Sequence, residues 1–161
     1  MNNNETLFIG IGNGFRQDDG AGIYILRQLE QLLNRVATCF FAQSSGEGTG
    51  LMELWQGYDH VILFDAIMKQ GRPGRTYYFL AEDNTFPSDF FNYSSHAFSL
   101  AEAVELARTL NKLPRRLMVY GVEGKDFNFG EELSREVIAG CNKIVKEVAS
   151  QYLQSNTCSL P

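Results

Sequence analysis

The segment at residues 6–33 constrains the fold more than any other part of the chain. A β-rich apolar run at residues 6–11 is stopped by glycine, and a helical stripe of apolar residues begins at Gly22. The turn between them carries two adjacent carboxylates, Asp18 and Asp19, where a phosphate-binding loop would have only glycine and backbone. The segment therefore predicts the active-site edge of an α/β fold, suited to a cation or to carboxylate chemistry rather than to phosphate.

Strand-like and helix-like segments alternate along the rest of the chain. Further strands are expected at residues 36–42, 60–65, 75–80 and 117–122, and helices at 51–55, at 99–110 and from 134 onward. The run at 60–65 is almost continuously apolar, which is typical of a central parallel strand. The alternation predicts a mostly parallel sheet with helices on both faces.

Length and charge restrict the class of protein. The 161 residues fit one domain, with a core at about residues 6–152 and a flexible tail at 153–161. A net charge of −5 argues against a nucleic-acid surface, and the aliphatic runs are too short to span a bilayer. The first residues lack the cationic and apolar parts of a signal peptide, so a cytoplasmic location is expected. Cys39, Cys141 and Cys158 form neither a C-x-x-C pair nor a disulfide framework.

Several polar residues are predicted to meet at one edge of the sheet, because ligands in such folds gather outside the carboxyl ends of the strands. Asp18 and Asp19 follow the first strand, Asp65 ends the third, and Glu123 follows the fifth. His96 lies in a loop before a helix and can return to the same edge. An acidic cluster with one imidazole can converge there.

Each candidate also has a purely structural explanation. Asp19 can cap the following helix, although this explains a consecutive pair of aspartates less well. Asp65 can be a cap or turn residue, and His96 a loop histidine with satisfied hydrogen bonds. Glu123 can pair with a nearby Arg or Lys, and His60 is expected at the surface.

Taken in order, these features resemble one known family, the endopeptidases that mature the large subunit of nickel–iron hydrogenases. The resemblance runs from about residue 6 to about residue 150. Four blocks carry it: Gly10-x-Gly12-Asn13-x-x-x-x-Asp18-Asp19-Gly20-x-Gly22; Gly48-Thr49-Gly50-Leu51 with Gly57-Tyr58-Asp59-x-Val61-Ile62-Leu63-Phe64-Asp65-Ala66; Ser94-Ser95-His96 with Leu100, Ala103, Leu106 and Ala107; and Val119-Tyr120-Gly121-Val122-Glu123 with Gly130-x-x-Leu133-Ser134-x-x-Val137.

The resemblance implies a three-layer αβα sandwich around a mostly parallel five-stranded sheet. It implies a protease that removes a C-terminal extension from the nickel-loaded large-subunit precursor. We expect a monomer, and the charge and the short apolar runs exclude a nucleic acid and a membrane as partners. Asp19, Asp65 and His96 are the implied metal-contacting and catalytic residues, and Asp19 is a shorter version of the family's frequent glutamate. The nickel is implied to arrive with the substrate, so no tightly bound metal or cofactor is expected. Either the metal or a carboxylate then activates water against the scissile carbonyl.

Other functions remain open at this point. A nickel-sensing chaperone would bind the same precursor and cut nothing. A dinucleotide-binding α/β protein is suggested by Gly10-x-Gly12, but the third glycine of that fingerprint is missing and Asp18 and Asp19 stand at the phosphate position. A peptidyl-tRNA hydrolase would need a basic groove, which does not suit an acidic chain. Serine or cysteine catalysis is disfavoured because there is no G-x-S-x-G elbow and no recognisable cysteine motif.

Overall fold

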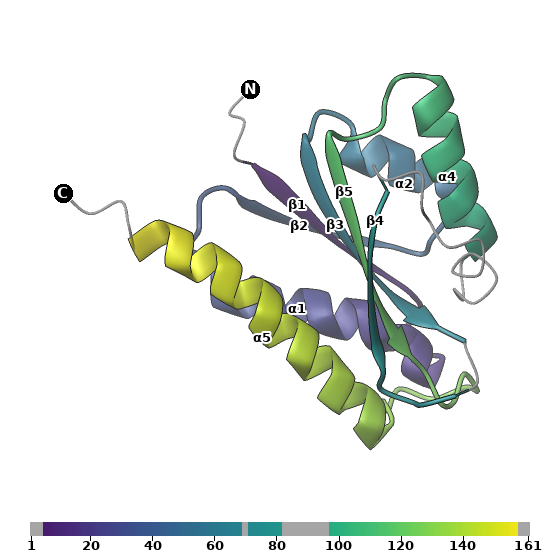
Figure 1. The fold of residues 1–161 in the computed structure, drawn as a ribbon. Helices are drawn as coiled ribbons and strands as arrows, with labels where there is room; N and C mark the ends of the chain where they lie inside the picture. The colour runs from purple at the N-terminus through teal and green to yellow at the C-terminus, as the bar shows by residue number, and fades with distance from the viewer. Residues whose placement is uncertain (1–4, 69–70, 82–96, 158–161) are drawn as a thin grey trace.

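The computed structural model describes residues 5–68, 71–81 and 97–157, and within them a single five-stranded sheet with helices on both faces (Figure 1). The strands follow the order β2-β1-β3-β5-β4, in which the first four are parallel and β4 is antiparallel to β5. Their bounds are Thr6–Ile11 for β1, Cys39–Ser44 for β2, His60–Ile67 for β3, Thr76–Leu80 for β4 and Arg116–Glu123 for β5.

The helices form one layer on each face of the sheet. α1 packs with α5 on one face and α2 packs with α4 on the other, which gives three layers (Figure 1). The predicted αβα architecture and the mostly parallel sheet are therefore confirmed. The helical bounds are Gln17–Gly20 for the 3-10 helix η1, Ala21–Leu33 for α1, Gly48–Trp55 for α2, Ala97–Thr109 for α4 and Arg135–Thr157 for α5.

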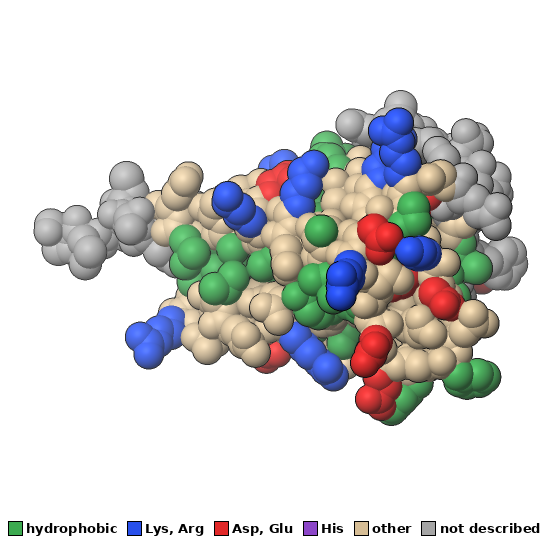
Figure 2. All heavy atoms as spheres, turned by 90° about the horizontal axis from the view of Figure 1, so that it is seen from below, with side chains coloured by type: hydrophobic (Ala, Val, Ile, Leu, Met, Phe, Trp, Pro, Cys, Tyr) green, Lys and Arg blue, Asp and Glu red, His purple; other side chains and the backbone are tan. Residues whose placement is uncertain are grey.

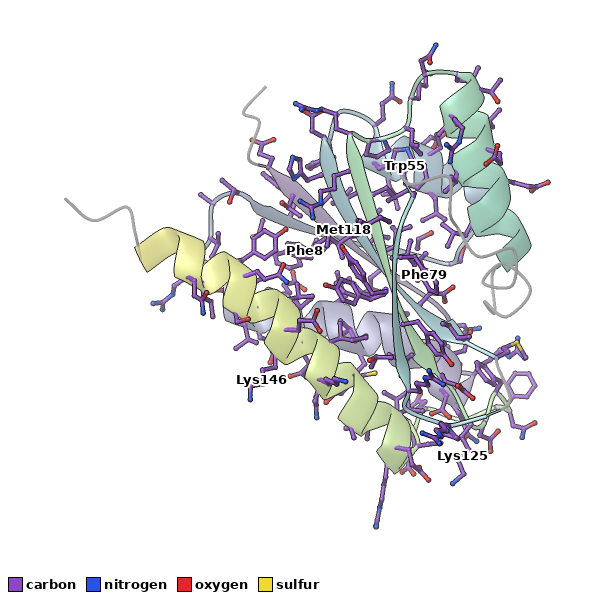
Figure 3. The ribbon with its side chains drawn as sticks, viewed as in Figure 1. Phe8, Trp55, Phe79, Met118, Lys125 and Lys146 are labelled. Carbon is purple, nitrogen blue, oxygen red and sulfur yellow. The ribbon has the colours of Figure 1, made fainter. Side chains whose placement is uncertain are left out.

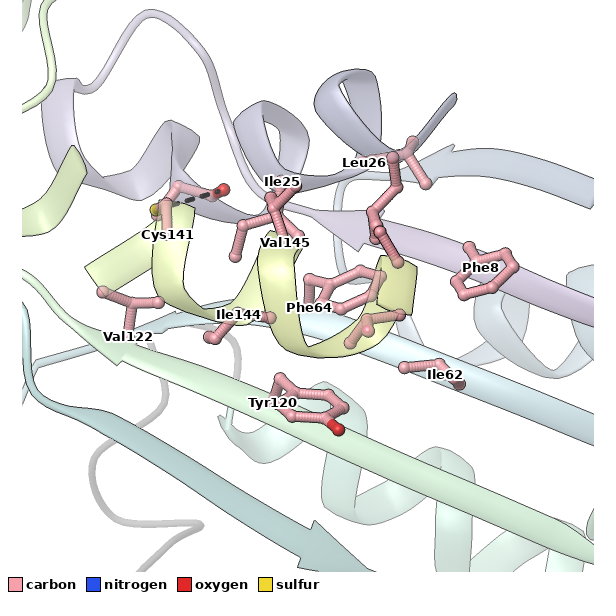
Figure 4. Packing of buried hydrophobic residues seen from close by; sticks show 14 of the residues in the cluster. Phe8, Ile25, Leu26, Ile62, Phe64, Tyr120, Val122, Cys141, Ile144 and Val145 are labelled. Atoms are coloured by element: carbon pink, nitrogen blue, oxygen red, sulfur yellow. Dashed lines mark hydrogen bonds between the residues drawn. The ribbon is translucent and has the colours of Figure 1, made fainter. Parts of the chain in front are cut away.

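The alternation of side chains along the strands divides the core into two clusters. Phe8, Phe64 and Tyr120 face α1 and α5, where Cys141 of α5 lies against the start of α1 (Figure 4). The residues on the other sides of these strands join the second cluster, which includes Trp55 of α2 and packs under α2 and α4 (Figure 3). Since both faces of the central strands are buried, the continuous apolar run predicted for β3 is explained.

Gly22 allows α1 to lie close to the ends of two strands. A Cβ at this position would collide with the carbonyl oxygens of Ile11 and Phe64, so only glycine permits this approach. The close packing presses the beginning of α1 against the carboxyl ends of β1 and β3, and so fixes the position of the turn that precedes the helix.

Several element boundaries differ from the prediction. β3 continues past Asp65 to Ile67, because β5 runs alongside it and supplies partners up to the pair Ile67–Glu123. β2 begins at Cys39, since residues 34–38 first complete a turn after α1. α5 extends to Thr157, beyond the core end predicted at about residue 152.

Within the part of the chain that is described, no helix is both long enough and apolar enough to span a membrane.

Candidate active site

The carboxyl ends of β1 and β3 meet where the chain reverses its direction across the sheet. From β1 the chain passes through α1 to β2 on one side, and it returns through α2 to β3 on the other side of β1. The two crossover helices cover opposite faces, so the carboxyl ends of β1 and β3 form a topological switch point, where ligands of such folds bind. Asp19 lies in η1 just after β1, and Asp65 lies near the end of β3.

Asp19 is held inside the turn that follows β1. Its side chain is buried, and Oδ2 accepts a hydrogen bond from the backbone N–H of Asn13 at 3.1 Å. Gly12, with a φ of 148°, closes the turn because a Cβ there would collide with the carbonyl oxygen of Asp19. Asp19 is not the cap of α1, since the N-cap residue is Gly20 and no side chain caps the helix. The capping explanation for Asp19 is therefore wrong.

Asp65 occupies the point in β3 where the sheet opens on one side. The ladder between β1 and β3 ends at the pair Gly10–Phe64, so Asp65 is the first residue beyond it, while β5 still pairs with it through Gly121. The carboxylate is fully buried, and Oδ1 accepts the backbone N–H of Ala66 at 2.8 Å. A buried charge is costly unless it is paired or serves a functional site, so the position of Asp65 beside the switch point favours a functional role.

The strand alternation determines which layer Asp65 faces. Leu63 and Ile67, two residues away on either side, belong to the cluster under α2 and α4, so Asp65 points to that layer. α4 leads into β5 at the amino edge of the sheet, and it therefore begins toward the carboxyl edge (Figure 1). Its first residue, Ala97, directly follows His96 in the sequence. His96 itself lies outside the described residues.

Asp18 has a different role from its neighbour Asp19. The carboxylate of Asp18 is fully buried and accepts four hydrogen bonds. The donors are the backbone N–H groups of Lys125, Asp126 and Ser134 and the hydroxyl of Ser134, at 2.7–2.8 Å. These donors replace the water that a buried anion loses. Asp18 thus fastens residues 124–134, near Lys125 in Figure 3, to the turn that carries Asp19.

Sequence reasoning did not find this role of Asp18. The sequence predicts Ser134 only as the start of the last helix, and nothing local in it indicates that the hydroxyl reaches a residue 116 positions away. The adjacent pair of aspartates was the available signal, because one cap position can use only one of them.

Glu123 and His60 also take defined places. Glu123 is buried at the end of β5 and accepts the backbone N–H of Arg72 at 2.8 Å and the hydroxyl of Tyr77 at 3.0 Å. It therefore anchors the connection between β3 and β4 by these bonds.

His60 begins β3 at the amino edge and is half-buried, at the opposite end of the strand from Asp65.

The described cysteines are poor nucleophiles. Burial raises the pKa of the Cys39 thiol to about 11, and burial together with the charge of Asp18 raises the pKa of the Cys141 thiol to about 12. Both thiols stay protonated near neutral pH, and the thiolate is the nucleophilic form. Cys158 lies outside the described residues.

Among the residues that are described, no group of three or more His, Cys, Asp and Glu side chains is arranged to hold a metal ion.

Comparison with known proteins identifies the family. The family model HycI, described as hydrogenase maturation protease, matches residues 24–151, which is more than half of the chain. The chain belongs to this family. Since hydrogenase maturation proteases are peptidases, the protein is a hydrolase that acts in the processing of a hydrogenase large subunit. The match includes Asp65 and His96 and begins just after the turn that carries Asp19.

Individual relatives agree with this assignment. The Hydrogenase 2 maturation protease of Escherichia coli (strain K12) is 28% identical over 160 residues, covering 96% of this chain and 94% of its own. The solved structure of the hydrogenase maturating endopeptidase HybD from E. coli superposes with a TM-score of 0.78 at 24% identity, covering 94% of this chain and 93% of its own. The NiFe hydrogenase maturation protease HybD from Thermococcus kodakarensis gives a TM-score of 0.71 at 24% identity, with 92% and 99% covered.

Proposed function

We propose that this hydrogenase maturation protease removes a C-terminal extension from the nickel-loaded large-subunit precursor of a nickel–iron hydrogenase. One observation carries the proposal beyond the family assignment. Two buried carboxylates, Asp19 in η1 after β1 and Asp65 near the end of β3, lie at the switch point of the sheet. Two buried carboxylates at the carboxyl ends of neighbouring strands are poorly suited to a phosphate-bearing ligand and well suited to a cation.

The proposed metal contacts are Asp19, Asp65 and His96. Two carboxylates and one imidazole suit a borderline divalent ion such as nickel and leave coordination positions for the substrate's own ligands. His96 is assigned through the sequence motif, and its place directly before α4 supports the assignment because Asp65 faces the layer that contains this helix. The nickel belongs to the substrate, so the protease would sense whether loading has occurred.

The reaction itself is the hydrolysis of one peptide bond. Water adds to the scissile carbonyl carbon, the bond from carbon to nitrogen breaks, and a proton passes to the departing amine. The water is activated either by the substrate's nickel or by one of the two carboxylates. In both cases the turn and β3 hold the carboxylates rigidly at the switch point between β1 and β3.

Mass analysis of a nickel-loaded precursor incubated with the protein tests this function. The precursor should lose its extension with the wild-type protein, and the nickel-free precursor should remain uncut. Asp65→Asn and His96→Ala should abolish processing, whereas His60→Ala, which changes the other histidine at the opposite edge, should leave it unchanged. A precursor that binds but keeps its full mass would instead indicate a nickel-sensing chaperone.

The same preparation tests the expected solution properties. With three separated candidate ligands, the purified protein should hold no stoichiometric metal and should take up a borderline divalent ion only weakly. We also propose that it acts as a monomer in the cytoplasm. Elemental analysis and light scattering measure metal content and mass, and zinc bound in every molecule would indicate an ordinary metallopeptidase.

A further inference from the structure

A groove of about 910 Å³ runs along the outer face of α1 beside the turn that carries Asp19. Its floor is formed by Ile23 and Arg27, which are four residues apart and so lie on one side of the helix. Residues of the turn after β1, of the end of β2 and around the start of α5 form its walls. The volume is within the range of ligand-binding clefts.

The groove is preformed because two of its walls are fastened to each other. Gln17 of the turn donates its backbone N–H to the carbonyl of Gly130 at 2.7 Å, and Gly130 donates back to the carbonyl of Phe15 at 2.9 Å. Asp18 adds its two bonds to Ser134 at the same junction. A rigid groove loses little conformational entropy when a ligand binds, which increases the affinity for a ligand that fits it.

The lining chemistry matches an extended peptide. Four glutamines from three elements line the groove: Gln17 from η1, Gln28 and Gln31 from α1, and Gln43 from β2. A carboxamide both donates and accepts, so such a set can pair with the alternating N–H and C=O groups of an extended backbone. The lining has one cation, Arg27, and one anion, Glu131. These charges would not neutralise a phosphate chain or another strongly acidic ligand.

The groove borders the turn that carries Asp19. Asn13 lines the groove and donates its backbone N–H to Oδ2 of Asp19 at 3.1 Å, so one residue borders both. Phe15, also in the lining, is 67% exposed, and Phe129 beside the Gly130 junction is 90% exposed. These two exposed aromatic side chains are available for contact with a partner.

We propose that this groove binds an extended peptide segment of the precursor next to the bond that is cut. The inference rests on the proposed function, since it assigns a second contact to the same substrate. Side-chain carboxamides hold the backbone of the segment, Phe15 covers it, and Arg27 donates hydrogen bonds to one of its carbonyl or carboxylate oxygens. The segment would then continue past Asn13 toward Asp19.

Steady-state processing of the nickel-loaded precursor by α1 variants tests the groove. Arg27→Ala and Gln31→Ala change exposed helical residues to the best helix former, so both variants should fold. Each should raise KM, by about tenfold for Arg27→Ala, while kcat changes less than about twofold. Arg115→Ala, which removes an exposed arginine just before β5 at the amino edge, is the matched control and should leave KM unchanged. Unchanged KM in both groove variants would overturn the proposal.

A binding measurement separates this proposal from the proposed function. A synthetic peptide copying the C-terminal end and extension of the organism's own precursor is titrated into isotope-labelled protein, and amide shifts are followed by NMR. Shifts centred on the 12–17 turn and on α1, weakened by Arg27→Ala, support the groove even if the protein never cuts the precursor. Shifts elsewhere, or none, overturn the groove while normal processing leaves the protease function intact.

Discussion

The carboxylate of Asp18 accepts both the backbone N–H and the hydroxyl of Ser134, at 2.7 and 2.8 Å. The two residues are 116 positions apart in the sequence, and the pair joins the turn after β1 to the start of α5. Because Asp19 is the next residue, any loosening of this junction is transmitted directly to the candidate active site. The relationship therefore makes Asp18 a positioning residue, whose effect on processing would act through Asp19.

The first prediction concerns the hydroxyl of Ser134. Ser134→Ala removes one donor from a buried anion and should lower the free energy of unfolding by about 1.5–2 kcal/mol. It should also lower kcat more than it raises KM, because the turn that carries Asp19 loosens. Ser134→Thr keeps the hydroxyl and should recover most of both losses. Urea unfolding and processing kinetics measure the two effects, and equal losses in both variants would contradict the assignment.

The second prediction uses the glycines. Gly22→Ala places a Cβ against the carbonyl oxygens of Ile11 and Phe64 and should cost about 3 kcal/mol of stability, since backbone must move. Gly50→Ala in α2 is the control, because a Cβ there meets nothing within 4 Å. It should stabilise the protein by about 0.5 kcal/mol through helix propensity. Thermal unfolding of the two variants measures the contrast, and a similar Tm for both would argue against the close packing of α1.

These glycines show how far the sequence alone reaches. The alternation of strand-like and helix-like patterns, including the strand-turn-helix at residues 6–33 and the apolar run of β3, was sufficient to predict the layers, because each pattern is local. The close approach at Gly22 and the bond from Asp18 to Ser134 were not predictable, since each depends on segments that meet only in the folded chain. The same reason applies to Asp65: its residue type was informative, but the strand end beside it depends on where β1 stops and β5 continues.

The third prediction is a loss of stability at alkaline pH. Thiols in the unfolded chain titrate near 9.0, whereas burial raises the pKa of Cys39 to about 11 and of Cys141 to about 12 in the folded protein. Between these values the unfolded state binds fewer protons, so the free energy of unfolding must fall as pH rises. The contribution is fully present below pH 9.0 and is lost as pH rises toward about 12.

Replacement of the cysteine tests the cause of this loss. Cys141→Ala removes the most strongly shifted thiol and should make the fall with pH shallower, although the small cavity lowers stability at every pH. Urea unfolding at a series of alkaline pH values gives the slopes. If the variant and the wild-type protein lose stability at the same rate above pH 9.0, the buried thiol is not responsible.

The last prediction separates charge from geometry at Asp19. Asp19→Asn keeps an oxygen that can accept the backbone N–H of Asn13, so the turn should close as before and Tm should change little. The variant lacks the negative charge, and it should therefore lose processing of the nickel-loaded precursor. Asp19→Glu keeps the charge and lengthens the side chain by one methylene, so it should retain partial processing despite tighter packing in a buried turn. Full activity in a folded Asp19→Asn variant would show that this carboxylate is structural, and it would remove Asp19 from the proposed metal contacts while leaving Asp65 and His96 to be tested separately.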